Sequence, residues 1–66
     1  MANVYGVYKT NTDGTLSWVV TEMPLTWGDA NHAVKFSYPD AASVALYLTN
    51  TEGYECKVGR PGDRQN

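Results

Sequence analysis

The sequence predicts a small α+β domain in which one helix packs on one face of a small antiparallel sheet. Three features support this fold class: an apolar hairpin near the N-terminus, an alanine-rich amphipathic stretch at 39–50, and an alternating stretch at 54–58. The expected order is strand, strand, short helical turn, helix, strand. Residues 1–59 are expected to form this single domain. Residues 60–66, rich in glycine, proline and charge, are expected to form a disordered tail.

Residues 4–9 and 16–21 predict the hairpin, because both stretches are rich in β-branched and aromatic residues. Asp13-Gly14 lies between them and supplies the positive-φ conformation that a tight turn requires. Side chains alternate along each strand, so each strand has an inward and an outward set. The sets expected to face inward are Tyr5 and Val7 on the first strand and Leu16, Trp18 and Val20 on the second.

Pro24 is expected to end the second strand, because proline cannot donate to a sheet ladder. Residues 27–33 are then expected to form a loop that enters one short helical turn, with Asp29 as its N-cap. Residues 35–36 are expected to be briefly extended.

Signals for both ends of the helix are present. Pro39 suits the first helical position, and Asp40 is favourable at the positive end of the helix dipole. Ser37 or Tyr38 is expected at the N-cap, and Gly53 can take the left-handed conformation of a C-cap. The wide buried face, with small residues at its middle, is expected to comprise Ala41, Ala42, Val44, Ala45, Leu46 and Leu48.

The composition excludes several classes of function. The formal net charge is −2 and the five cations are scattered, so duplex nucleic acid is not an expected partner. No apolar run approaches the ~20 residues of a membrane span, so no membrane partner is expected. The chain opens without a basic and apolar leader, which predicts a cytoplasmic protein. Cys56 is alone, so it can form neither an internal disulfide nor a structural zinc site.

No catalytic, cofactor or metal site is predicted, and an enzyme is not expected. His32, the only histidine, follows Asp29 by three residues, and such a pair could transfer protons or bind a metal. The favoured interpretation is an exposed or capping His32, because the spacing predicts no third ligand. The six glycines are dispersed singly and form no phosphate-binding loop.

A further pattern spans most of residues 4–58. It comprises Trp27-Gly28-Asp29, Ala33, Phe36, Ala42, Ala45, Gly53-Tyr54 and Val58. These residues resemble a type of small protein encoded by phages and prophages, which has a hairpin, a W-x-D turn, an A-x-x-F motif, an alanine-containing helix and a closing strand. The chain departs from that type in a longer apolar segment at 23–25. The resemblance implies a viral origin and the binding and inhibition of a host protein.

The leading hypothesis is a non-enzymatic phage-type accessory protein that binds and inhibits a host protein in the bacterial cytoplasm, as anti-CRISPR proteins and transcription inhibitors do. One helix covers only one face of the sheet, so the other face is expected to present an apolar association surface. On the polar side of the helix, Tyr47 is a second candidate because tyrosine is common at interface hot spots. The expected partner-binding residues are Tyr8, Val19, Thr21, Tyr47 and Lys57.

Three alternatives stand beside this hypothesis. Tyr8 and Val19 could pair across the strands and shield each other, which would leave no binding face. The hairpin aromatics Tyr5, Tyr8 and Trp18 could stack the bases of single-stranded nucleic acid. A homodimer could form through open faces or edge strands, as a structural or assembly component, because so short a chain buries little surface alone.

Overall fold

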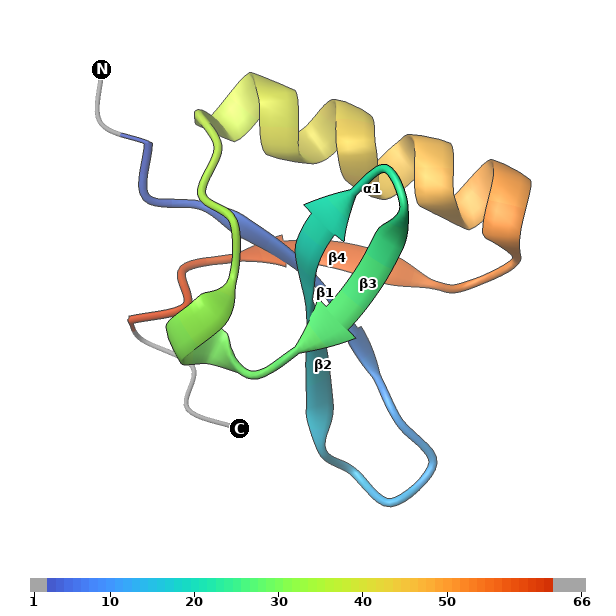
Figure 1. The fold of residues 1–66 in the computed structure, drawn as a ribbon. Helices are drawn as coiled ribbons and strands as arrows, with labels where there is room; N and C mark the ends of the chain where they lie inside the picture. The colour runs from blue at the N-terminus through green and yellow to red at the C-terminus, as the bar shows by residue number, and fades with distance from the viewer. Residues whose placement is uncertain (1–2, 63–66) are drawn as a thin grey trace.

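Four antiparallel strands and a single helix form the fold of residues 3–62, the part of the chain that the computed structural model describes (Figure 1). The elements in chain order are β1 (Gly6–Thr10), β2 (Leu16–Glu22), β3 (Leu25–Gly28), the 3-10 turn η1 (Ala30–His32), α1 (Tyr38–Glu52) and β4 (Cys56–Gly59). The strand order is β3-β2-β1-β4, and α1 packs against β1 and β4. The predicted α+β fold class is confirmed.

The hairpin predicted at the N-terminus is formed by β1 and β2, with Tyr8 opposite Trp18. Gly14 has a φ of 90°, a left-handed value that glycine adopts without a Cβ clash. The Asp13 carboxylate accepts hydrogen bonds from the Thr15 amide at 3.0 Å and from the Thr15 hydroxyl at 2.6 Å. These two bonds fix the turn.

A second hairpin, between β2 and β3, lies where the sequence predicts a loop. Pro24 follows the end of β2, as predicted, but the chain turns at Met23-Pro24 and runs back along β2 with Leu25 opposite Glu22. Trp27 therefore lies in a strand rather than in the predicted loop. With four residues, β3 has too few alternating side chains to produce a recognisable strand period.

The helix has the predicted caps, although it begins at Tyr38, so that Pro39 is its second residue rather than its first. Ser37 is the N-cap, Pro39 and Asp40 lie in the first turn, and Gly53 closes the helix with a left-handed φ of 78°. Its buried face is narrower than predicted, because Leu46 is 63% exposed. The expectation for Leu46 is wrong because α1 packs mainly against β1 and β4, and the stripe of the helix that is buried comprises Ala41, Ala45 and Leu48.

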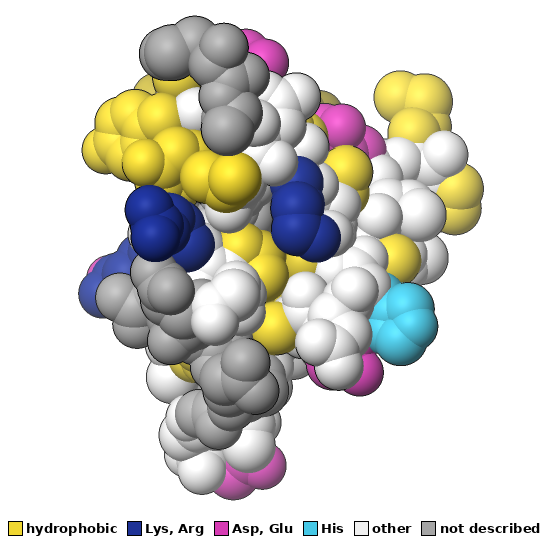
Figure 2. All heavy atoms as spheres, turned by 90° about the vertical axis from the view of Figure 1, so that its left-hand side faces the viewer, with side chains coloured by type: hydrophobic (Ala, Val, Ile, Leu, Met, Phe, Trp, Pro, Cys, Tyr) yellow, Lys and Arg dark blue, Asp and Glu magenta, His cyan; other side chains and the backbone are white. Residues whose placement is uncertain are grey.

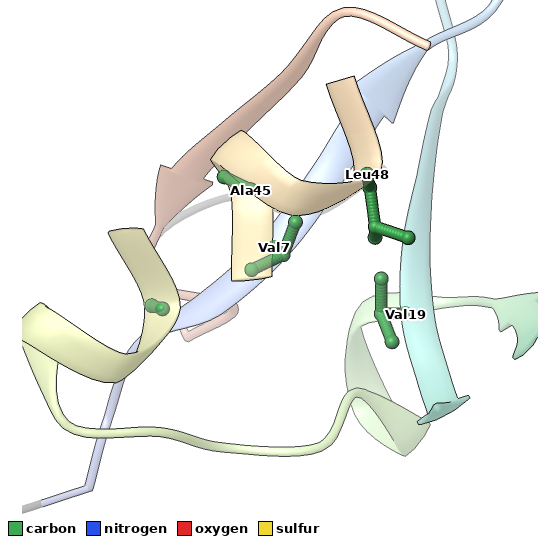
Figure 3. Packing of buried hydrophobic residues seen from close by; sticks show 5 residues of the cluster. Val7, Val19, Ala45 and Leu48 are labelled. Carbon is green, nitrogen blue, oxygen red and sulfur yellow. The ribbon is translucent and has the colours of Figure 1, made fainter. Parts of the chain in front are cut away.

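The larger core lies between α1 and the side of the sheet that it covers, here called the helix face. Figure 3 shows Val7 close to Ala45, and Leu48 pointing toward Val19. Full burial of one valine or leucine side chain contributes about 1.5–3 kcal/mol to stability. The small side chain of Ala45 lets the helix approach β1 closely.

The opposite face of the sheet is covered as well, which overturns the expectation of an open face. Trp18 is fully buried there beside Tyr8, with ring centroids 4.9 Å apart. The chain at η1 packs over these rings through Ala33, and a side chain at Gly6 would meet Pro61. Both sides of the sheet are therefore occupied by the chain itself.

The inward set predicted for β2 is reversed. Trp18 points away from α1, while Val19 points toward it. Residues directly opposite each other in a sheet share a face, and successive residues alternate. Because Val7 faces the helix, Tyr8 and its partner Trp18 must face the other way.

Segment 33–36 joins β1 and β2 where the two strands separate. Tyr5 and Phe36 exchange backbone hydrogen bonds of 3.0 and 2.6 Å, and the Val34 amide donates to the Val19 carbonyl at 3.0 Å. The predicted extended conformation is confirmed at Phe36. Beyond β4, Pro61 is buried, so packing continues past the predicted boundary at 59, and residues 63–66 of the predicted tail lie outside the described residues.

Gly6→Ala is expected to destabilise the protein by about 1–3 kcal/mol. A Cβ at Gly6 would lie 3.0 Å from both Pro61 Cγ and Trp18 Cε3, closer than ordinary contact. Gly62→Ala is the matched control, since no described atom lies within 4 Å of a Cβ there. Urea unfolding of both variants measures the difference, and equal stabilities would contradict the tight packing of the opposite face.

Candidate functional site

Two of the predicted partner-binding residues are buried. Val19 is fully enclosed in the helix-face core, and Tyr8 is 6% exposed on the opposite face. Neither can contact a partner while the domain is folded, so their predicted exposure is wrong. They do not shield each other either, because they lie on different faces; Tyr8 packs on Trp18.

The other three predicted residues are exposed but do not share one surface. The Thr21 hydroxyl donates to the Pro24 carbonyl at 2.5 Å and lies 2.7 Å from the Thr26 hydroxyl, so it is engaged within its own hairpin. Lys57 lies on β4, at the other edge of the sheet. Tyr47 lies on α1, and it alone of the three borders an apolar hollow.

This hollow, here called the hairpin groove, lies between α1 and the β2–β3 hairpin. Its volume is about 290 Å³, and it is lined by Glu22, Leu25, Ser43, Val44, Tyr47 and Leu48. The groove exists because α1 packs over β1 and β4, so the second hairpin rises beside the helix rather than beneath it (Figure 1).

An exposed tyrosine and a carboxylate line the hairpin groove, and an exposed methionine and a second carboxylate lie near the lining residues in the chain. Tyr47 is 63% exposed on the helix wall, and Met23, 94% exposed, lies at the tip of the hairpin. Glu22 is the one charged residue among the described residues that line the groove. Asp40 precedes Val44 by one helical turn, on the same side of the helix. The groove is therefore apolar with an acidic border.

The sequence identifies Tyr47 but neither Leu25 nor Glu22 as a site residue. Both belong to the second hairpin, which the sequence does not predict. The available signal was the longer apolar segment at 23–25, which is the point where the chain departs from the phage-type pattern.

The helix face also carries an aromatic pair that holds a lysine. The Lys9 Nζ lies 3.9 Å from the centroid of the Tyr54 ring and 4.6 Å from that of Trp27, and the two rings meet edge-on at 5.4 Å. This contact joins β1, β3 and the segment that follows α1. It is a structural tie, and the ammonium group is occupied by the chain's own rings.

Cys56 lies on β4 as a half-buried side chain. Burial raises the pKa of the Cys56 thiol, and the positive charge of Lys9 offsets part of the rise. The backbone amide of Cys56 donates to the Thr49 hydroxyl at 3.2 Å. A thiol with a raised pKa is a poor nucleophile at neutral pH.

Asp29 and His32 form an exposed cap. Asp29 is the N-cap of η1, as predicted, and its Oδ1 accepts from the His32 amide at 3.1 Å and lies 2.6 Å from His32 Nδ1. The hydrogen bond from His32 lowers the pKa of Asp29 below its usual value. Residues 3–62 contain no group of three or more His, Cys, Asp or Glu side chains arranged to hold a metal.

The hairpin aromatics do not form a platform for stacking bases. Trp18 and Tyr8 are buried, and Tyr5 is half-buried with its ring in edge contact with Tyr38 at 5.2 Å. The aromatic content that suggested a single-stranded nucleic-acid binder is therefore used for packing.

A basic area lies apart from the hairpin groove. Figure 2 shows Lys and Arg side chains beside a hydrophobic area on one side of the molecule. A hollow of about 320 Å³ is lined by Val4, Lys35, Arg60 and Gly62, none of which lines the groove. The two hollows thus differ in charge.

No helix among the described residues has both the length and the apolar character needed to span a membrane. Comparison of the chain with known protein families, curated proteins and solved structures gave no match.

Asp29→Ala is expected to lower the melting temperature at about pH 7, because it removes the η1 cap. The pKa of Asp29 is lower in the folded than in the unfolded state, so its contribution is complete above the unfolded value of about 3.9 and is lost as the pH falls through the folded value. The gap between wild type and variant should therefore close in acid. Glu55→Ala, which removes an exposed carboxylate but no cap, is the control; a gap that persists at about pH 2 would contradict the capping role.

Lys9→Met, which keeps the apolar stem but removes the charge, should reduce the free energy of unfolding by about 0.5–2 kcal/mol. Lys9→Arg should restore most of this loss, since a guanidinium also stacks on aromatic rings. Lys57→Met removes an exposed lysine of β4 and serves as the control, measured in the same denaturant titrations. Equal effects of Lys9→Met and Lys57→Met would contradict the aromatic contact.

Proposed function

We propose that the protein is a non-enzymatic binding module that docks another protein in the hairpin groove. The observation that carries this proposal is the groove itself: an apolar hollow with an exposed tyrosine on its helix wall and an exposed methionine at the hairpin tip. Apolar surface that a small domain leaves exposed commonly marks an association site.

The lining of the groove suits an apolar side chain from the partner. Leu25, Val44 and Leu48 supply apolar walls, and Tyr47 supplies a large ring that is already outside the core. Tyrosine is among the residues that contribute most to interface energies when a partner encloses them. At about 290 Å³ the groove is at the lower limit of small-molecule sites, so it fits one or two anchoring side chains of a larger partner.

The charge around the groove indicates a basic partner segment. Glu22 lines the groove and Asp40 lies on the same side of the helix, and none of the described lining residues is a cation. Opposite charge at the border of an interface favours the correct partner and speeds encounter. The expected ligand is therefore a segment that carries an apolar anchor beside a lysine or arginine.

The resemblance of this chain to small phage and prophage proteins supports a bacterial host protein as the partner. In this proposal, occupation of the groove by a segment of the host protein blocks that segment from its own partners, in the bacterial cytoplasm. Inhibition would then follow from binding alone and needs no catalytic group.

A displayed library of random peptides tests the groove. Wild-type protein should enrich peptides with an apolar anchor and a basic residue, and Tyr47→Ala should weaken binding of those peptides by about tenfold or more. Leu46→Ala is the matched control, because Leu46 is adjacent in sequence and equally exposed but lies outside the groove. Its affinity should equal that of wild type.

Thermal unfolding of both variants checks that each is folded. Absence of any enriched peptide, or equal losses for Tyr47→Ala and Leu46→Ala, would contradict docking in the hairpin groove.

A further inference from the structure

We infer that the free edge of β3 takes up an extended segment of the partner as a fifth strand of the sheet. The inference rests on the proposed function and specifies how the partner binds: as a β-strand whose backbone pairs with β3 and whose side chains reach the hairpin groove. Three features of β3 carry it.

The first feature is the position and composition of β3. It is an outer strand in the order β3-β2-β1-β4, and within residues 3–62 it pairs only with β2 (Figure 1). Edge strands are usually protected from further pairing by charged residues or proline. The other outer strand, β4, contains Lys57, whereas β3 contains neither a charged residue nor a proline, its residues being Leu25, Thr26, Trp27 and Gly28.

The second feature is the direction of the backbone groups of Thr26. Leu25 and Glu22 close a two-residue turn, so Thr26 and Thr21 form the next pair of the hairpin. Their hydroxyls lie 2.7 Å apart, the close approach of a non-hydrogen-bonded pair. In such a pair the amide and carbonyl of each residue point away from the partner strand. Those of Thr26 therefore point to the free edge, where no further strand of residues 3–62 pairs with β3.

The third feature is the continuity of this edge with the groove. Leu25 belongs both to β3 and to the groove lining. Because side chains directly opposite each other share a face of the sheet, a residue added opposite Leu25 would emerge on the helix face, beside the groove. A basic side chain near the same end of the added strand would lie close to Glu22, which is opposite Leu25 in the hairpin. A bound helix could reach the groove but could not pair with Thr26.

The occupant is therefore an extended peptide segment of the partner, with alternating apolar residues and one lysine or arginine. Strand addition of this kind derives affinity from main-chain hydrogen bonds and selectivity from pockets for alternate side chains. The edge of β3 supplies the main-chain hydrogen bonds, and the hairpin groove supplies the pocket for side chains.

The test compares Thr26→Pro with Thr26→Val, using the peptides selected on the wild-type protein. Proline removes the outward amide while leaving the pairing of β3 with β2 intact, as is typical of prolines on sheet edges. Valine removes the hydroxyl but keeps the amide. Thr26→Pro should weaken binding by about tenfold, the effect of losing one backbone hydrogen bond, and Thr26→Val should bind like wild type.

A second measurement leaves the protein unchanged and so does not depend on the folding of a variant. Methylation of successive backbone nitrogens of a selected peptide should abolish binding at every other position, because alternate amides of an added strand point to β3. Losses with a spacing of three or four residues, or no losses at all, would overturn strand addition.

The outcomes separate this inference from the proposed function. Sensitivity to Tyr47→Ala without sensitivity to Thr26→Pro or to methylation would overturn strand addition and leave groove docking in place. Insensitivity to all three changes would overturn both. Sedimentation could show that the free protein is a dimer, which Thr26→Pro dissociates and Thr26→Val does not. That result would assign the edge of β3 to a second copy of this chain and overturn its pairing with a partner segment.

Discussion

The register between β1 and β2 is the constraint on which both cores depend. With Tyr8 opposite Trp18, the two rings share one face of the sheet, and the alternation of side chains turns Val7 toward the helix. A shift of one residue in either strand would place a large ring beneath α1, where Val7 and Val19 now pack with Ala45 and Leu48. Both faces of the sheet are apolar as a result, and a chain of 66 residues must cover both.

The covering of two faces by so short a chain determines where apolar surface is left over. The single long helix lies over β1 and β4, while η1 and Pro61 close the opposite face. Within residues 3–62, no further element covers the side of the β2–β3 hairpin next to α1. The hairpin groove therefore results from the position of the helix over β1 and β4. It lies at the periphery of the sheet rather than at its centre.

The charged side chains differ between the helix face, the hairpin groove and the hollow that lies apart from it. Lys9, on β1, has its ammonium group over the rings of Trp27 and Tyr54. A hollow lined by Lys35 and Arg60 lies apart from the groove, and the groove has Glu22 in its lining. The hairpin groove is consequently the hollow with a carboxylate in its lining, and it adjoins the strand edge that carries no charge.

The sequence by itself determined the fold class, the first hairpin, the helix with both of its caps, and Tyr47 as an exposed candidate, because turns, caps and helical periodicity depend on neighbours in the chain. It did not determine which side of β2 faces the helix, the existence of β3, or the burial of Tyr8 and Val19. Strand faces depend on register with a partner strand, and a strand of four residues is stabilised by the ladder that it joins rather than by its own composition. Leu25 and Glu22 became site residues only when tertiary packing placed the second hairpin beside α1, a contact between distant segments that no local pattern encodes.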